Sequence, residues 1–478
     1  MTPSPPVPAR RAGAVILAAG LGTRMRSRLP KVLHPLCGRP MLAYVIDAWR
    51  AAANGPDPLR PIVVVAPAMA SVRAAFADDV EFALQDEPRG TGDAVGVALA
   101  ALPDGTAELL VLSGDVPLVR GADLAALLDV RREDDAAIAL LTVDSADPAR
   151  LGRVVRGEFG TVERIVEAKD ATPEELEIGE VNAGIYAFDA AWLRRRVAAL
   201  EPSPTTGELY LTDLVAIARR DGRIVSAVAH EDDGRFDGIN DRAELARAEW
   251  TLRVRINEGH MTAGVTMQDP STAYLDWGVR VAPDVTLEPN VVLRGTTIIG
   301  EGTRVGAGST IVDSTIGRDC LVWASVVESS TVEDEARIGP FAHLRPGSHV
   351  GPGAEVGNFA ELKNTRLGAR VKQHHVSYLG DAELGEGTNV GAGTITANWD
   401  GHRKHRTTVG RGAFLGVDTM LVAPVTVGDE ARTGAGAVVT RDVPAGKLAV
   451  GVPARVREPR RAASDDGAPR VPSRDAQR

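Results

Sequence analysis

The feature that most restricts the fold of this chain is an aliphatic residue that recurs every six positions through its second half, usually followed by glycine. The repeated positions are Ile338, Leu344, Val350, Val356 and Leu362, then Leu384 and Val390, then Leu415, Leu421, Val427, Thr433 and Val439. A spacing of six matches neither the helical period of about 3.6 nor the alternation of a half-buried strand. It predicts a parallel β-helix over residues 264–456, with aliphatic side chains in the interior and small residues at the corners.

The first 240 residues follow a different pattern. Apolar strands are predicted near residues 14–18, 62–66 and 109–112, and they alternate with predicted helices near 41–53 and 92–101. Such alternation predicts a Rossmann-like α/β domain, in which a parallel sheet carries helices on both faces.

A connecting helix and a tail complete the predicted organisation. Within residues 241–263, Leu245, Ala248 and Leu252 recur at helical spacing after Asp241 and Glu244, which resemble a capping box. Residues 457–478 consist mostly of Arg, Ser, Asp and Pro with little to bury, so we expect a disordered tail.

Composition excludes several functional classes. A formal net charge of −10 disfavours nucleic-acid binding, which depends on neutralising phosphates. The two cysteines, Cys37 and Cys320, exclude a disulfide framework and a cysteine-rich zinc site, and they fit the reducing cytoplasm. No apolar run reaches the roughly 18 residues of a membrane-spanning helix, so no membrane insertion is expected.

A glycine-rich turn from Leu17 to Arg24 directly follows the first predicted strand. Such a turn exposes backbone N–H groups to a phosphate. The dinucleotide fingerprint is excluded because Met25 stands where its third glycine belongs, and the ending of a P-loop is also absent. Arg24 and Lys31, one of only six lysines, instead place two cations beside the turn, which favours a triphosphate cradle.

Three segments in order carry a family resemblance. The stretch from Leu17 to Leu42, then Gln85 with Gly90-Thr91-Gly92, then Ser113-Gly114-Asp115, resemble the signature of sugar-nucleotide pyrophosphorylases. Together with the hexapeptide repeats, the chain is similar to the bacterial bifunctional family of N-acetylglucosamine-1-phosphate uridylyltransferases and glucosamine-1-phosphate acetyltransferases. The resemblance implies an α/β nucleotidyltransferase domain, a long connecting helix and a left-handed parallel β-helix.

For the first domain, the resemblance implies uridylyl transfer from UTP to N-acetylglucosamine 1-phosphate with Mg²⁺. Asp115 follows a predicted strand at the sheet edge where α/β folds bind ligands, and its carboxylate suits Mg²⁺. The resemblance supplies Asn240 as the second metal ligand. The implied nucleotide and sugar contacts are Leu17, Ala18, Ala19, Gly20, Arg24, Lys31, Gln85, Gly90, Thr91, Ser113, Gly114, Asp115, Gly152, Glu167, Asn182 and Asn240. Asp93 stands where the family pattern has a histidine.

For the second domain, the resemblance implies transfer of an acetyl group from acetyl-CoA to glucosamine 1-phosphate. His374 and His375 interrupt the hexapeptide rhythm, and neighbours on a strand point oppositely, so only one can face a given site. The family motif, a histidine three residues before Tyr378, identifies His375 as the catalytic base, a role that suits a group titrating near neutral pH. Backbone N–H groups around Gly391–Gly393 are expected to hold the oxyanion.

Further contacts follow from the same resemblance. The substrate contacts are Arg345, Lys363, Tyr378, Asn389 and Lys404, and the acetyl-CoA contacts are Ala392, Asn398, Trp399, Val417 and Ala435. Glu361 is a candidate to orient His375, and Lys404 is expected to reach the phosphate of a neighbouring subunit in a homotrimer. Val417 occupies a position where serine is expected.

The sequence leaves two alternative functions open. A single-activity sugar-nucleotide pyrophosphorylase with a structural or regulatory β-helix would lack the His375–Tyr378 pair. A scaffold with a dead nucleotide site is disfavoured because Arg24, Lys31 and Asp115 are all present.

Overall fold

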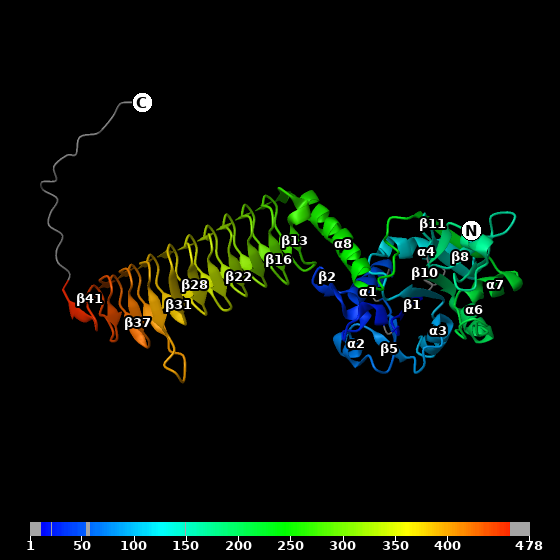
Figure 1. Cartoon of the computed structure of the whole chain (residues 1–478), viewed down its shortest axis with the longest axis horizontal. Coiled ribbons are helices and arrows are strands. Elements are labelled where there is room, and N and C mark those ends of the chain that lie inside the picture. Colours follow the sequence, from blue (N-terminus) through cyan, green and yellow to red (C-terminus); the bar gives the residue numbers. More distant parts are fainter. Residues whose placement is uncertain (1–10, 21, 54–57, 149, 459–478) are drawn as a thin grey trace, which may run out of the picture. The chain divides into compact units, whose positions relative to one another are not determined.

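The computed structural model describes residues 11–20, 22–53, 58–148 and 150–458, and the chain divides into two compact units between Arg253 and Val254 (Figure 1). Within these ranges no helix has both the length and the apolar character to cross a membrane. Most of the tail predicted for residues 457–478 lies outside the described residues, which end at Glu458.

The first unit is built on a mixed sheet. Its strand order is β11 (Val225–Glu231), β7 (Ile138–Asp144), β10 (Glu180–Asp189), β6 (Glu108–Ser113), β1 (Ala12–Leu17), β4 (Ile62–Val65) and β5 (Glu81–Leu84). All of these pairings are parallel except those of β10, which runs antiparallel to both neighbours.

The predicted α/β fold is confirmed, and the expected parallel sheet is interrupted by the antiparallel strand β10. The preceding segment forms the hairpin β8 (Arg153–Arg156) and β9 (Val162–Val166), and β8 pairs with the start of β10. The hairpin thus stays at the edge where β7 ends, since Glu180 of β10 lies opposite Asp144. The chain re-enters the sheet from that edge and must run backwards, because a parallel entry would need a long crossover.

Helices cover both faces of this sheet. On one face, α3 (Thr91–Leu99), α6 (Ala190–Arg196) and α7 (Asp213–Arg220) share a core with alternate strand residues such as Val15 and Val111. α1 (Met41–Ala52) and α4 (Gly121–Glu133) pack against each other, and the alternate residue Ile16 is also fully buried. Burial on both faces explains why these strands are continuous apolar runs.

The second unit is a left-handed parallel β-helix with three faces, drawn as a stack of coils in Figure 1. Face 1 runs from β12 (Thr266–Met267) to β41 (Leu448–Val450), face 2 from β13 (Tyr274–Leu275) to β40 (Val438–Val439), and face 3 from β14 (Arg280–Val281) to β38 (Val425–Val427). On each face a strand pairs in parallel with the strand of the next coil. β42 (Arg455–Arg457) pairs antiparallel with β41 and covers the last edge of face 1.

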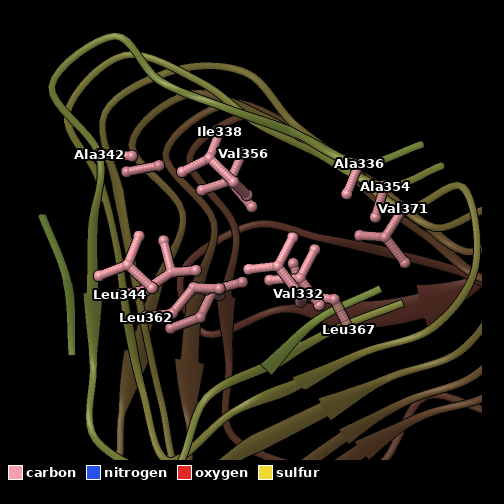
Figure 2. Packing of buried hydrophobic residues seen from close by; sticks show 14 of the residues in the cluster. Val332, Ala336, Ile338, Ala342, Leu344, Ala354, Val356, Leu362, Leu367 and Val371 are labelled. Carbon is pink, nitrogen blue, oxygen red and sulfur yellow. The ribbon is translucent and has the colours of Figure 1, made fainter. Parts of the chain in front are cut away.

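The predicted aliphatic positions form the interior of this stack. Ile338 lies opposite Val356 on face 1 and Leu344 opposite Leu362 on face 2, and all four are buried. Figure 2 shows these side chains packed inside successive coils. Full burial of each such side chain stabilises the fold by roughly 1.5–3 kcal/mol. The hexapeptide prediction is confirmed.

α8 (Arg242–Thr262) spans the boundary between the units. In the first unit Asp241 precedes it, and the Asp241 carboxylate accepts hydrogen bonds from the N–H groups of Ala243 and Glu244, both at 2.9 Å. In the second unit Asn257 donates from its amide to the carbonyls of Pro270 and Ala273 at 2.8 and 3.1 Å, which fixes the last turns of the helix to the first coil.

Candidate active sites

A cavity of about 270 Å³ opens at the carboxyl ends of β1 and β6 in the first unit. Its lining includes ten of the residues that the sequence assigned to the nucleotide site: Leu17, Ala18, Ala19, Gly20, Lys31, Gln85, Gly90, Thr91, Ser113 and Asp115. Val32, Pro88, Ala94 and Glu208 also line it and were not predicted. The glycine-rich turn, the Gln85 segment and the Asp115 segment thus converge on one space.

Two oxygen atoms in this site point at the same cation. The Lys31 ammonium, in a short 3₁₀ turn (Lys31–Leu33), donates to Asp115 Oδ2 and also to Asn240 Oδ1 at 3.3 Å. Arg24 Nη2 donates to Asn240 Oδ1 at 3.0 Å, and Ser113 Oγ donates to Asp115 Oδ1 at 2.7 Å. A backbone bond from Ile239 N–H to the Asp115 carbonyl, 2.9 Å, holds the two segments together.

This donor set fits Mg²⁺. A carboxylate oxygen and an amide oxygen that accept from one ammonium also face a point where a hard cation can bind. Among the described residues, no group of three or more His, Cys, Asp or Glu side chains is arranged to hold a metal, so a metal here would rely on few protein ligands. Mg²⁺ commonly uses one or two protein oxygens and completes its shell with phosphates and water.

Gln85 lines the same cavity, and its amide group is fixed by hydrogen bonds. It is 5 % exposed, and its Nε2 donates to the Gly90 carbonyl at 3.1 Å and to Asp93 Oδ2 at 2.8 Å. Asp93 therefore engages Gln85 directly. With both amide hydrogens used, Gln85 presents Oε1, an acceptor, to a ligand.

Gly90 allows a close approach between two loops. Its φ is +107°, and a Cβ there would lie 2.5 Å from the Leu209 carbonyl oxygen. The Gly92 N–H donates to that carbonyl at 2.8 Å, and the Leu209 N–H donates to the Arg89 carbonyl at 2.7 Å. These bonds bring the loop that carries Glu208 to the rim of the cavity.

The three residues assigned to the sugar form a second cluster. The Asn182 N–H donates to the Gly152 carbonyl at 2.9 Å, and a Cβ on Gly152 would lie 3.6 Å from the Glu167 carboxylate. Thr212 Oγ1 donates to Glu167 at 3.0 Å, and Asn182 Nδ2 donates to the Tyr186 hydroxyl at 2.6 Å. Burial raises the pKa of Glu167, and burial likewise raises the pKa of Tyr186.

Thr212 and Tyr186 were missed by the sequence analysis. A threonine before a helix indicates a helix cap, and a tyrosine in an apolar strand indicates core, so neither residue type signals a sugar site.

In the solenoid, face 2 places charged residues in register. Arg345 lies on β25 (His343–Arg345), Glu361 and Lys363 on β28 (Ala360–Lys363), and Tyr378 on β31 (Ser377–Gly380). Arg345 pairs with Lys363, and Glu361 with Tyr378, across neighbouring strands. Proximity to the Lys404 ammonium, and then to Arg345, lowers the pKa of Lys363. The three cations suit a phosphate.

Two residues on this face have partners that the hexapeptide period does not predict. Lys404 lies beside Lys363 of its own chain, and its expected contact with the phosphate of a neighbouring subunit stays a prediction. Glu361, a candidate to orient His375, accepts from Arg345 Nη1 at 3.0 Å, and its role toward His375 stays a prediction. The period does not predict these contacts, because Lys404 lies on a loop outside the coils and Glu361 has several neighbours along its face.

The loop that carries Lys404 joins β34 (Ile395–Ala397) to β35 (Thr407–Val409) and extends out of the stack, orange in Figure 1. Trp399 and Lys404 form an antiparallel bridge across it. The Asp400 carboxylate closes its turn by accepting from the N–H groups of His402 and Arg403, both at 2.8 Å. The Arg403 N–H and the His405 ring hold the pKa of Asp400 below its usual range. After this turn the chain re-enters the stack at β35, on face 3.

Gly380 leaves room for two polar side chains. A Cβ there would lie 2.7 Å from Asn398 Nδ2 and closer still to the Tyr378 hydroxyl. Asn398 Nδ2 donates to Asp381 Oδ2 at 2.6 Å. The structure therefore brings Asn398 close to Tyr378 and Asp381, whereas Asn389 lies on face 1, beside Lys372.

His375 stands at the corner between faces 1 and 2, after β30 (Lys372–Gln373), and is exposed. Its ring has no hydrogen-bond partner among the described residues. The neighbouring His374 donates from Nε2 to Glu355 Oε2 at 2.8 Å, and the His374 and His375 imidazole rings stand 6.3 Å apart at 89°. Of the pair, His374 is thus engaged by a carboxylate, whereas the His375 ring has no such partner among the described residues.

Ala392, Val417 and Ala435 follow His375 along the same corner. The registers Gln373–Val390 and Val390–Leu415, continued around the corner, put these residues on successive coils. Asp418 N–H donates to the Ala392 carbonyl at 2.7 Å, and Gly436 N–H donates to the Val417 carbonyl at 2.8 Å. Val417 is 49 % exposed, so this corner presents an apolar side chain to solvent.

The backbone hydrogen bonds near Ala392 show which N–H group of this turn is available to hold the oxyanion. The Gly391 N–H donates to the Leu415 carbonyl at 2.8 Å and the Gly393 N–H to the Val376 carbonyl at 2.7 Å. In the part of the chain that the structure describes, the Ala392 N–H has no such acceptor. It is therefore the free donor of this turn, one coil from His375.

Comparisons with known proteins cover both units. Residues 14–173 match the family of MobA-like NTP transferase domains, and residues 406–441 match the hexapeptide repeat of succinyl-transferase. A curated bifunctional protein GlmU from Rubrobacter xylanophilus is 46 % identical over 443 residues, 93 % of each chain. Proteins of the same name from Pelobacter propionicus (46 % over 440 residues, 91 % of this chain and 95 % of the relative) and Mycolicibacterium vanbaalenii (44 % over 449 residues, 92 % and 90 %) are similarly close.

Proposed function

This chain belongs to the family of bifunctional GlmU proteins, and from that premise we propose how each of its units works. It is a bifunctional transferase that makes UDP-N-acetylglucosamine, a precursor of peptidoglycan. The solenoid acetylates glucosamine 1-phosphate with acetyl-CoA, and the α/β unit then transfers a uridylyl group from UTP to N-acetylglucosamine 1-phosphate, releasing pyrophosphate.

Uridylyl transfer rests on positioning and charge. We assign the phosphate end of the cavity to Lys31 and Arg24, whose cations neutralise the phosphates as the sugar phosphate attacks the α-phosphorus of UTP in line. Gln85 Oε1 accepts the imino N–H of uracil, because its amide hydrogens are held by Gly90 and Asp93. The convergence of Asp115 and Asn240 on one cation is the observation that carries this assignment.

We propose Mg²⁺ as the metal of this site, held by Asp115 Oδ2 and Asn240 Oδ1. When bound, it supplies charge neutralisation and orientation of the phosphates. The neighbouring Gly152, Glu167 and Asn182 then hold the sugar, with Thr212 fixing the Glu167 carboxylate at 3.0 Å.

Acetyl transfer needs a base, since the acceptor amine is mostly protonated at neutral pH. We assign His375 Nε2 or Nδ1 to take the amine proton as the nitrogen attacks the thioester carbonyl; the tetrahedral intermediate then expels the CoA thiolate. The Ala392 N–H stabilises the oxyanion, and Arg345, Lys363 and Lys404 bind the sugar phosphate.

We also propose a homotrimer in the cytoplasm. Large apolar side chains remain exposed along the solenoid, among them Trp323, Phe341, Phe359 and Phe414, and the rings of Phe341 and Phe359 stack at 5.4 Å. Such surfaces mark interfaces, and closed cyclic symmetry satisfies a contact between unlike faces of identical chains. Light scattering that found a stable, fully active monomer would contradict this assembly.

One assay tests the two reactions together. The purified protein is incubated with glucosamine 1-phosphate, acetyl-CoA, UTP and Mg²⁺, and each component is omitted in turn. Without UTP, N-acetylglucosamine 1-phosphate should accumulate; without acetyl-CoA, UDP-N-acetylglucosamine should form only when N-acetylglucosamine 1-phosphate is added. Omission of Mg²⁺ should stop uridylyl transfer alone. Failure of either step in the complete mixture would contradict the proposed function.

A further inference from the structure

The interior column of face 1 is mostly aliphatic but contains a buried amide side chain, that of Gln373. In register, Ile338, Val356, Gln373, Val390 and Leu415 occupy successive coils, and Gln373 is 0 % exposed. Its Oε1 is buried with no hydrogen-bond partner in the described chain. A buried acceptor without a partner destabilises a fold, so its presence calls for a functional explanation.

A second polar residue of the same column behaves differently. Thr433 is also buried, but its Oγ1 accepts from the Gly416 N–H at 2.9 Å and shares a hydrogen bond with Thr419 Oγ1 at 2.7 Å. Thr433 therefore satisfies its hydroxyl within the wall of the solenoid. Gln373 satisfies only half of its amide.

The amide nitrogen of Gln373 is connected to His375 by two hydrogen bonds. Gln373 Nε2 donates to Ser377 Oγ at 2.8 Å, and Ser377 Oγ in turn donates to the His375 carbonyl at 2.8 Å. Because the hydroxyl accepts from the glutamine, its single hydrogen is directed to that carbonyl. The buried amide thus fixes the peptide that carries the exposed imidazole.

A corner three coils earlier shows what replaces the glutamine elsewhere. Ser325 Oγ donates to the Trp323 carbonyl at 2.7 Å, the same two-residue span, and accepts from the Ala342 N–H of the next coil at 3.1 Å. At Ser377 the equivalent N–H, that of Thr394, donates instead to the Gly391 carbonyl at 3.3 Å. Gln373 therefore supplies the donor that the backbone does not.

We propose that Gln373 is a positioning residue for acetyl transfer, which acts through the Ser377 hydroxyl on the His375 carbonyl and so fixes the direction of the His375 imidazole. This inference rests on the proposed role of His375 as general base. Displacement of a catalytic group by about an ångström lowers turnover by as much as ~10²-fold, so loss of this restraint should be felt in turnover rather than in substrate binding.

The test replaces the glutamine with an apolar side chain of similar length. In the full-length protein, Gln373→Met should raise the melting temperature of the solenoid by about 2–4 °C, because the unpaired acceptor is gone. It should lower kcat for acetyl transfer roughly tenfold, leave KM for glucosamine 1-phosphate unchanged and leave uridylyl transfer unchanged. A stabilised but slower enzyme is a result that a merely structural glutamine would not give.

Two further variants separate the possible outcomes. Ser377→Ala should slow acetyl transfer to the same extent, and the double variant should be no slower than either single variant, because both act through one chain of bonds. Ser325→Ala, which removes the matched bond from a corner without site residues, should leave kcat unchanged. A wild-type kcat in Gln373→Met, or effects that multiply in the double variant, would overturn the proposal. If Gln373→Met were normal while His375→Ala was inactive, only the positioning role would fall; if His375→Ala were also normal, the assignment of the base would fall with it.

Discussion

The two units bind similar anionic substrates, but their sites are built from differently spaced parts of the sequence. In the α/β unit, the contacts of the site join residues far apart in sequence: Arg24 with Asn240, and Lys31 with Asp115. In the solenoid, Arg345 meets Glu361 sixteen residues later and Asn398 meets Asp381 seventeen residues earlier. One site is assembled by a sheet that gathers distant loops, and the other by a ladder that stacks neighbouring coils.

This difference sets how each site responds to change. A solenoid site depends on side chains that share a column, so a substitution disturbs the coil above and the coil below. The α/β site depends on loops held by a few long-range bonds, such as that from Ile239 N–H to the Asp115 carbonyl. We therefore expect substitutions to affect one reaction without the other.

The largest expected effect is on the metal ligand. Asp115→Ala should lower uridylyl transfer by roughly 10³-fold, because it removes the carboxylate that pairs with Lys31 and that we assign to the metal. Acetyl transfer should stay normal. Separate assays of the two half-reactions check this. Asp129→Ala, at an exposed position on α4, is the matched control and should alter neither rate. Near-normal uridylyl transfer in Asp115→Ala would refute the metal assignment.

A smaller effect is expected where the solenoid packs two polar side chains against a glycine. Gly380→Ala places a methyl group against Tyr378 and Asn398, so acetyl transfer should fall by roughly 10²-fold in kcat/KM while uridylyl transfer is unchanged. Gly96→Ala on α3 is the control, since a Cβ there would meet only Val197 Cγ2 at 3.8 Å. Equal losses of both reactions in Gly380→Ala would show that the two units are not separable.

The loop outside the coils gives the next smaller effect. Lys404→Ala removes one of the three cations Arg345, Lys363 and Lys404, so KM for glucosamine 1-phosphate should rise roughly tenfold with little change in kcat. Arg406→Ala is the control, because Arg406 is engaged by Glu383 on face 3 at 2.8 Å. An unchanged KM in Lys404→Ala would remove this residue from the phosphate site.

The smallest effect concerns stability. Burial raises the pKa of Glu167, so the carboxyl favours folding most when it is protonated, below its unfolded pKa, and that contribution is lost as pH rises through the raised folded pKa. Glu167→Gln should therefore raise the melting temperature of the α/β unit by roughly 2–4 °C at pH 7 and have no effect near pH 4. Thermal unfolding monitored by hydrogen exchange of β9 measures the melting temperature at both pH values. A rise in melting temperature that persists at pH 4 would contradict the burial argument.

The same contrast explains what the sequence could predict. The period alone places Ile338, Val356 and Leu362 in the interior, because each coil repeats the environment of the last. It does not place Lys404, since the loop from Asn398 to Arg406 leaves the repeat. It also gives no reason for a buried Gln373, which only the contact with Ser377 reveals.

In the α/β unit, local patterns predict the strands and the glycine-rich turn but not their partners. The direction of β10 depends on the hairpin of β8 and β9, a long-range choice that no local window contains. Asp115 could be located after its strand, whereas Asn240 needed the family resemblance, and Glu208 and Thr212 carried no signal of their own. Sites gathered from distant loops are predictable only where a motif marks each part.

The central claim is that one chain carries two independent chemistries joined by a diffusible intermediate. The direct measurement is the formation of UDP-N-acetylglucosamine from glucosamine 1-phosphate by Asp115→Ala and His375→Ala, each alone and then mixed. Alone, Asp115→Ala should stop at N-acetylglucosamine 1-phosphate, and His375→Ala should lose acetyl transfer by roughly 10²–10⁴-fold while keeping uridylyl transfer. The mixture should restore product formation. A mixture that stays inactive, or a single substitution that removes both reactions, would contradict the account.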